Sequence, residues 1–166
     1  MPQAALIDLH REVVQTTWVD YNDHMNVAYY VLIFDHATDA LLDFVGLNHL
    51  HREKTKNSVF VVESHLTYEK EVMKGDELRV TTQILDMDEK RLHIFHRMYL
   101  IDSNDLVSTN ELMILGVNLS KRRVYPFAEK VAANLNRIML SQKSLPHPPQ
   151  AGQSIGIRKS SNAIQH

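Results

Sequence analysis

The segment from Val27 to Val45 contains neither glycine nor proline, and most of its side chains are apolar. Its acidic residues Asp35, Asp39 and Asp43 recur every four positions, so they would share one narrow stripe of an α-helix. A helix that is apolar around most of its circumference must be covered by more than one flat surface. The sequence therefore predicts one long, buried central helix. Asn26 is suited to cap its start, and Gly46 to end it in the left-handed conformation.

After this helix, the apolar period changes to two, as in half-buried strands. Clusters of turn-forming residues separate the strand-like segments, and the connections are short. We therefore expect consecutive antiparallel strands arranged as a meander. Another strand is expected before the helix, where β-branched and aromatic residues cluster. The predicted strands cover residues 13–19, 58–69, 78–84, 91–101 and 106–119.

We expect a single domain over residues 1–143, of the α+β class, with an antiparallel sheet wrapped around the long helix. Apolar residues at helical spacing predict a closing helix over about 128–142. From Ser144 the composition shifts to Pro, Gly, Ser and Gln, so residues 144–166 are expected to form an extended or disordered tail. A single sheet layer leaves an edge strand exposed, which favours association with a second copy.

Composition excludes several classes of function. The 166 residues include 18 Lys and Arg against 20 Asp and Glu, so the basic excess typical of nucleic-acid-binding proteins is missing. The chain has no cysteine, which rules out disulfides, thiolate zinc sites and a cysteine nucleophile, and agrees with the cytoplasmic location that we expect. Its longest apolar run, residues 27–34, is far shorter than the roughly 20 residues of a membrane span, so no membrane partner is expected.

The polar segment before the central helix is the strongest candidate for a reactive site. The first turn of a helix offers free N–H groups and partial positive charge, which can hold an oxyanion or polarise a carbonyl group. Asp20 lies just upstream, where it could act on such a carbonyl as a base or as a nucleophile. The alternative is that Asp20, Asn22, Asp23 and Asn26 are only turn and cap residues.

The pattern Asp20-x-x-Asp23-His24-Met25-Asn26 resembles the Asp-x-x-Gly-His-(Val/Met)-Asn signature of hotdog-fold acyl-CoA thioesterases of the 4-hydroxybenzoyl-CoA thioesterase type. The resemblance covers residues 9–127 in the family's order of elements. Asp23 stands where the family usually has glycine; if that position needs a positive φ, aspartate is among the few tolerated replacements. Further matching residues are Tyr68, Gly75, Asp76, Glu77, Leu78, Lys90, Arg91, Thr109, Glu111 and Pro126.

This resemblance implies the hotdog fold and hydrolysis of an acyl-CoA thioester. Asp20 matches the catalytic carboxylate, which either activates water or attacks the thioester carbon to form a mixed anhydride. Backbone N–H groups near Asn26 and Val27 would polarise the thioester oxygen, and His24 and Asn26 would position the loop or the acyl group. The active site would lie between two subunits of at least a homodimer, or of a homotetramer. No cofactor is implied, because coenzyme A is part of the substrate.

A finer resemblance is to the betainyl-CoA thioesterases of carnitine degradation. The residues that carry this resemblance are 18–22, 28–30, 39–42 and 63–65 (including Glu63), together with His93, His96 and Met98. A trimethylammonium acyl group favours aromatic faces and a nearby carboxylate. Trp18, Tyr21, Tyr29 and Tyr30 could supply the faces and Asp23 the charge; the alternative is that these aromatic residues pack in the core.

Two basic pairs are candidates for binding the phosphates of CoA. Lys90 and Arg91 start one predicted strand, and Arg122 and Arg123, with Lys121 before them, follow the last one, although such pairs are also common at solvated strand ends. We expect no metal site. Of the ten histidines, His49 and His51 are predicted in a loop, while His93 and His96 would lie on opposite faces of one strand.

Two other functions stay open. The same fold serves acyl-CoA hydratases and dehydratases, which usually pair an aspartate with a histidine five residues later. Here that position is Met25, which disfavours a hydratase. The second alternative is a non-catalytic module that binds acyl-CoA or acyl-carrier protein, which would not depend on Asp20.

Overall fold

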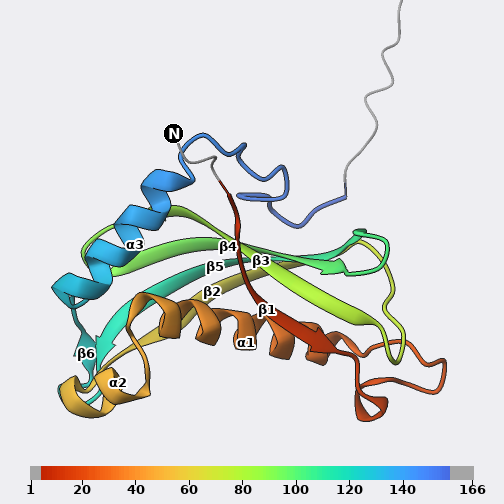
Figure 1. Ribbon diagram of the computed structural model, residues 1–166, viewed down its shortest axis with the longest axis horizontal. Coiled ribbons are helices and arrows are strands. Elements are labelled where there is room, and N and C mark those ends of the chain that lie inside the picture. Colours follow the sequence, from red (N-terminus) through yellow and green to blue (C-terminus); the bar gives the residue numbers. More distant parts are fainter. Residues whose placement is uncertain (1–4, 158–166) are drawn as a thin grey trace, which may run out of the picture.

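The computed structural model describes residues 5–157, which form one antiparallel sheet with a long helix on one face (Figure 1). The strands lie in the order β1-β3-β4-β5-β2, and the short β6 pairs with β5. No helix within residues 5–157 has the length and apolarity needed to cross a membrane. The elements are β1 (Ile7–Val13), α1 (Val27–Val45), α2 (His49–Thr55), β2 (Asn57–Tyr68), β3 (Glu77–Met87), β4 (Arg91–Leu100), β5 (Leu106–Asn118), β6 (Arg123–Val124) and α3 (Glu129–Ser141).

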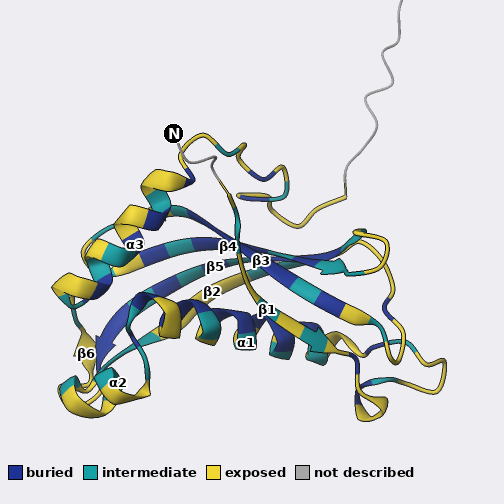
Figure 2. Ribbon diagram, viewed as in Figure 1, coloured by how far each residue is buried: buried dark blue, intermediate teal, exposed yellow. Residues whose placement is uncertain are grey.

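Helix α1 has the predicted bounds and caps. The Asn26 side chain accepts a hydrogen bond from the backbone N–H of Ala28, and Gly46 ends the helix at φ 94°. Its buried residues recur at the spacing of one helix face, which lies on the sheet, whereas Val31 and Phe44 are exposed on the other side. The predicted antiparallel sheet around one long helix is therefore confirmed, and in the single chain the other side of α1 is partly exposed (Figure 2).

The predicted first strand, residues 13–19, is wrong. The strand is β1, and Thr16–Trp18 forms a 3-10 turn instead. The backbone N–H of Trp18 donates to the carbonyl of Gln15, and the Trp18 side chain is buried. Burial of this one large side chain overrides the strand propensity of the two threonines.

The meander holds only for β3, β4 and β5. The β2 strand pairs antiparallel with β5, at the far edge of the sheet from β1, and not with β3. Residues 69–76 must therefore cross the end of the sheet to connect β2 with β3. The connection is short enough for a hairpin, so its length gave no signal of the crossing.

Helix α3 packs on the same face of the sheet as α1, because its Leu135 lies in one buried cluster with Leu42 of α1 and Ile94 of β4. Helix α3 confirms the predicted closing helix, and the Asn134 side chain donates to the carbonyl of Val45 at the end of α1. Residues 144–157 contain no helix or strand, yet they are held to the sheet: Ala151 is buried, and the Gly152 N–H donates to a Glu111 carboxylate oxygen. Residues 158–166 of the predicted tail lie outside the described residues. Helix α2 was not predicted; it places His49 and His51 on a helix, where a loop was expected.

Candidate active site at the start of helix α1

The loop before α1 is held in shape by main-chain hydrogen bonds. The N–H of Asp20 donates to the carbonyl of His24 at 2.9 Å, and the N–H of Asp23 donates back to the carbonyl of Asp20 at 3.1 Å. Asp23 has φ 61°, so this position does need a positive φ, as the resemblance suggested. The turn keeps its geometry with aspartate in place of glycine.

The segment that connects β2 with β3 is joined to this loop by main-chain hydrogen bonds. The N–H of Met25 donates to the carbonyl of Val72 at 2.8 Å, and Met25 and Val72 are both buried. The N–H of Lys74 donates to the carbonyl of Asp23 at 3.3 Å, and His24 forms an isolated β-bridge with Met73. The crossing of residues 69–76 therefore gives the loop a rigid support.

The Asp20 carboxylate is fixed by one of its two oxygens. Its Oδ1 accepts the backbone N–H groups of Asn22 at 2.8 Å and of His24 at 3.2 Å. Within residues 5–157, Oδ2 has no hydrogen-bond partner, and the residue is exposed. One oxygen therefore orients the group while the other stays open to a reactant.

The backbone N–H groups of Asn26 and Val27 were both expected to polarise the thioester oxygen, but only one of them is free at the first turn of α1. The N–H of Asn26 is taken by the carbonyl of Trp18 at 2.9 Å, so it is not available to polarise a substrate. The N–H of Ala28 is taken by Asn26 Oδ1 at 3.0 Å. The N–H of Val27 has no partner in the described part of the chain, and Val27 is exposed. The free donor at this helix end is therefore that of Val27.

A groove of about 530 Å³ begins beside this helix end. His24 points its Nε2 at a carboxylate oxygen of Glu71, 2.7 Å away, and both residues line the groove. The ring of Tyr30 meets Tyr68 edge to face at 5.2 Å, and burial raises the pKa of Tyr30. The groove is lined by His24, Met25, Val27, Tyr30, Tyr68, Glu69, Lys70, Glu71 and Val72.

The aromatic residues predicted to meet a cation are not equally accessible. Trp18 is 7% exposed and stacks on Tyr29, with ring centroids 5.3 Å apart, so it packs in the core and offers no open face; that expectation is corrected. Tyr21 is 96% exposed, on the loop itself. The acidic side chains Glu69 and Glu71 were missed by the sequence reasoning, because only the crossing of residues 69–76 brings them to the groove.

The predicted basic residues lie far from Asp20 within one chain. Lys90 pairs with Glu89 at 3.2 Å, and Arg91 donates to Asp88 at 2.6 Å. The N–H of Lys90 and the Arg91 side chain lower the pKa of Asp88 to about 2. Both residues follow the β3–β4 turn, whereas the Asp20 loop joins the opposite end of the sheet (Figure 1).

Arg122 and Arg123 lie at the same end of the sheet as Lys90 and Arg91. They line a second groove, of about 410 Å³, together with Phe60, Leu119 and other apolar side chains between β2 and β6. Glu63 lines a third hollow, with His93 and Glu111 and beside residues 152–154. Neither Glu63 nor the basic pairs therefore meet Asp20 in the single chain.

Comparison with known proteins identifies the family. The model of a family described as the thioesterase-like superfamily matches residues 14–135 of the chain. This chain belongs to the thioesterase-like superfamily. The match spans the Asp20 loop, α1 and all of β2 to β6, and it confirms the predicted hotdog fold and a thioester hydrolase.

Individual relatives agree with this thioesterase assignment. A betainyl-CoA thioesterase from Pseudomonas aeruginosa is 40% identical over 84% of this chain and 88% of its own length. An L-carnitine dehydrogenase/betainyl-CoA thioesterase from Rhizobium meliloti is 34% identical over 88% of this chain, which corresponds to only 29% of that longer protein. A Staphylococcus aureus protein solved in complex with CoA superposes with a TM-score of 0.89, at 33% identity, covering 95% of this chain and 99% of the other.

Proposed function

We propose that this thioesterase hydrolyses a short, polar acyl-CoA, with betainyl-CoA as the substrate, to the free acid and CoA. The observation that carries the proposal is the pairing of an open carboxylate oxygen on Asp20 with an unpartnered N–H at Val27 in one braced loop. The similarity to a betainyl-CoA thioesterase over most of both chains supports the choice of acyl group.

In the proposed reaction, the thioester oxygen accepts the N–H of Val27 at the positive end of α1. Asp20 Oδ2 either takes a proton from an attacking water or attacks the thioester carbon itself. In both routes negative charge develops on the former carbonyl oxygen, which the helix N-terminus stabilises, and the C–S bond then breaks to release CoA as its thiolate. In the second route the acyl group is left on Asp20 as a mixed anhydride, which water then hydrolyses to the free acid and the Asp20 carboxylate. Asn26 acts indirectly, by capping the helix, and His24 by holding the loop against Glu71.

The groove beside the loop suits a cationic acyl group. Tyr68 gives it an exposed aromatic wall, with the buried Tyr30 packed behind it, and Glu69 and Glu71 give it negative charge. A trimethylammonium group gains from both, because aromatic faces and carboxylates attract a cation. We therefore propose that Glu71 and Tyr68 contribute to acyl selection, with Asp23 and Tyr21 at the loop surface and Tyr29 behind them.

We further propose that the working unit is at least a homodimer formed along β2. This edge strand exposes three successive apolar residues, Phe60, Val61 and Val62, which is the type of edge that pairs with another strand. Antiparallel pairing of β2 with its copy would bring the Arg122–Arg123 end of one chain toward the Asp20 end of the other. Each site would then gain cations for the CoA phosphates that its own chain places too far away.

The cytoplasmic location and the absence of a cofactor stay predictions. The proposed chemistry is consistent with the second, because Asp20 and the Val27 N–H act on the thioester without a further group.

The central experiment compares the wild type with Asp20→Asn on a panel of acyl-CoAs, with CoA binding measured in parallel. We expect kcat to fall at least about 100-fold in the variant, since a general base or nucleophile is removed, and CoA affinity to stay nearly unchanged. Equal thiol release by both proteins would remove Asp20 from the mechanism. No release from any acyl-CoA, with CoA still bound, would favour the binding module.

Acyl selection is tested with an isosteric pair, betainyl-CoA and 3,3-dimethylbutyryl-CoA, which differ only by nitrogen in place of carbon. Glu71→Gln removes the charge but leaves an amide that can still meet His24. We expect about a 5- to 10-fold loss of kcat/KM for betainyl-CoA alone, as for one partly solvated cation–carboxylate contact. Equal losses on both substrates would contradict cation recognition. Glu53→Gln, which removes the carboxylate from the similar His49–Glu53 pair outside the groove, serves as the matched control.

A further inference from the structure

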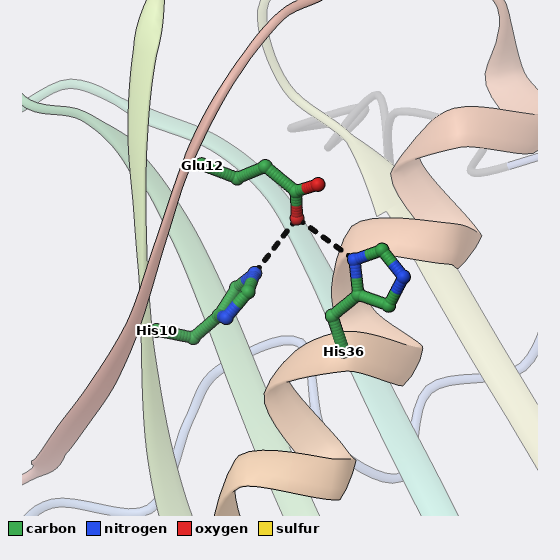
Figure 3. Close-up of side chains that lie close together, drawn as sticks. All are labelled: His10, Glu12 and His36. Carbon is green, nitrogen blue, oxygen red and sulfur yellow. Dashed lines mark hydrogen bonds and ion pairs between the residues drawn. The ribbon is translucent and has the colours of Figure 1, made fainter.

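Three side chains from two elements converge where β1 passes over the middle of α1 (Figure 3). His10 Nε2 lies 2.8 Å from Glu12 Oε2, and His36 Nδ1 lies 2.9 Å from the same oxygen. The three possible ligand atoms all lie within 4.8 Å of one another. Both histidines therefore direct a ring nitrogen at one carboxylate oxygen.

The convergence follows from the local folds. His10 and Glu12 are two residues apart on β1, so their side chains leave the same face of the strand. Helix α1 packs along β1 and presents His36 to that face. The His10 and Glu12 side chains are 18% and 16% exposed, and His36 is 39% exposed. The cluster is thus shielded on the strand side and open to solvent beside His36.

We propose that His10, Glu12 and His36 bind one divalent transition-metal ion, with Zn²⁺ as the preferred ion. Imidazole nitrogen and carboxylate oxygen are ligands of Zn²⁺ at about 2.0–2.2 Å, so two such ligands on one ion lie roughly 3 Å apart. Glu12 Oε2 already lies at that spacing from each ring nitrogen. The ion would replace the protons that now join the two rings to the carboxylate.

The neighbouring His96 is not a fourth ligand. Its Nε2 faces the hydroxyl of Thr38 at 3.0 Å and its Nδ1 faces that of Thr82 at 2.8 Å, so both ring nitrogens are engaged. The fourth position on the ion therefore belongs to water, which can enter beside the half-exposed His36.

This site is separate from the proposed reaction. His36 lies ten residues after Asn26, which is about 15 Å along the helix axis. The ion would connect the edge strand β1 to the middle of α1, two elements that the chain joins through residues 14–26. Its expected effect is on stability, and the proposal does not depend on the identity of the thioester substrate.

The test uses the full chain after removal of metal with a chelator. Titration with ZnCl₂ in a calorimeter should give one ion per chain, and CoCl₂ should give a visible absorption spectrum typical of four ligands that include nitrogen. At a free Zn²⁺ concentration 100 times its Kd, the melting temperature should rise by about 5–10 °C. His36→Gln and Glu12→Gln should each weaken binding at least about 100-fold, since each removes a direct ligand.

His49→Gln is the matched control, because His49 forms a similar pair with Glu53, at 3.2 Å, on the exposed surface of α2. It should leave affinity, stoichiometry and the cobalt spectrum unchanged. His36 is partly exposed, so His36→Gln is expected to fold, and circular dichroism checks this. Wild-type protein that takes up no Zn²⁺, or a His36→Gln variant that folds and binds as tightly as the wild type, would overturn the proposal.

Discussion

The start and the middle of α1 are built in opposite ways. At its start, main-chain hydrogen bonds hold residues 19–26, and Asp20, Tyr21 and Val27 remain exposed. In its middle, side-chain contacts hold the helix on the sheet. Phe34 stacks on His96, and the His96 ring is fully buried between the hydroxyls of Thr38 and Thr82. A loop that is fixed through its backbone can leave its side chains free for chemistry, whereas a packed core cannot. Substitutions at the start should therefore change activity, and those in the middle should change stability.

The largest expected effect on stability is in the packed middle. Phe34→Ala removes a fully buried ring and should lower the free energy of unfolding by about 3–5 kcal/mol. Phe44→Ala, on the same helix but 59% exposed, should change it by less than about 1 kcal/mol. Urea titrations of both variants measure the difference. Similar losses in the two would mean that α1 is covered on both sides in solution.

The second prediction concerns pH. Burial, and then the nearby His10, lower the pKa of His96 to about 3, whereas an unfolded histidine titrates near 6.5. Above pH 6.5 both states are neutral and the full stability is present. Below it the unfolded chain takes up the proton first, so stability should fall by up to about 1.4 kcal/mol per pH unit until about pH 3.

Urea midpoints of the wild type and His96→Gln at pH 7, 6 and 5 separate this contribution from that of the other histidines. The variant should be less stable at pH 7 but lose less stability on acidification. Parallel curves for the two proteins would show that His96 does not cause the dependence.

Asn26 lies at the boundary between the two regions and should affect both properties. Asn26→Ala removes the oxygen that accepts the Ala28 N–H, which should cost about 1 kcal/mol of stability. The end of the helix that carries the Val27 N–H should also become less ordered, so kcat should fall. Asn26→Ser, which retains a capping oxygen, should recover most of both losses in melting and thiol-release assays.

The smallest stability effect is expected on the loop surface. Asp23→Gly suits the positive φ and keeps both backbone hydrogen bonds, so stability should change by less than about 0.5 kcal/mol. Asp23→Val, which the left-handed conformation disfavours, should cost about 1–2 kcal/mol. If thermal melting instead shows that Asp23→Gly is strongly destabilising, the Asp23 side chain holds the loop, and the backbone account of this region is wrong.

Local signals predicted the elements well where one residue type decides the outcome. Asn26 and Gly46 marked both ends of α1, and the motif around Asp20 located the loop and the family. Prediction failed where contacts between residues far apart in the sequence determine the local structure or the strand pairing. Burial of Trp18 turned an expected strand into a 3-10 turn, and the pairing of β2 with β5 depends on contacts between residues far apart in sequence.

The same reason explains what was missed at the candidate site. Glu71 reaches His24 only because residues 69–76 cross beneath the loop, and Asn26 loses its free N–H only because the carbonyl of Trp18 lies against it. The cluster of His10, Glu12 and His36 likewise has no signature in one element, since two of its members come from β1 and the third from α1. A search for metal ligands within single helices or loops therefore does not find this cluster.

The crossing of residues 69–76 has one mechanical consequence. It is the direct continuation of β2, the edge along which a second copy would dock, and it ends in the hydrogen bonds that shape the Asp20 turn. A displacement of β2 would be transmitted to the Asp20 turn through only the few residues between Tyr68 and Val72. In the proposed dimer, assembly and turnover would then be linked, and the specific activity of dilute enzyme should decline as its subunits separate.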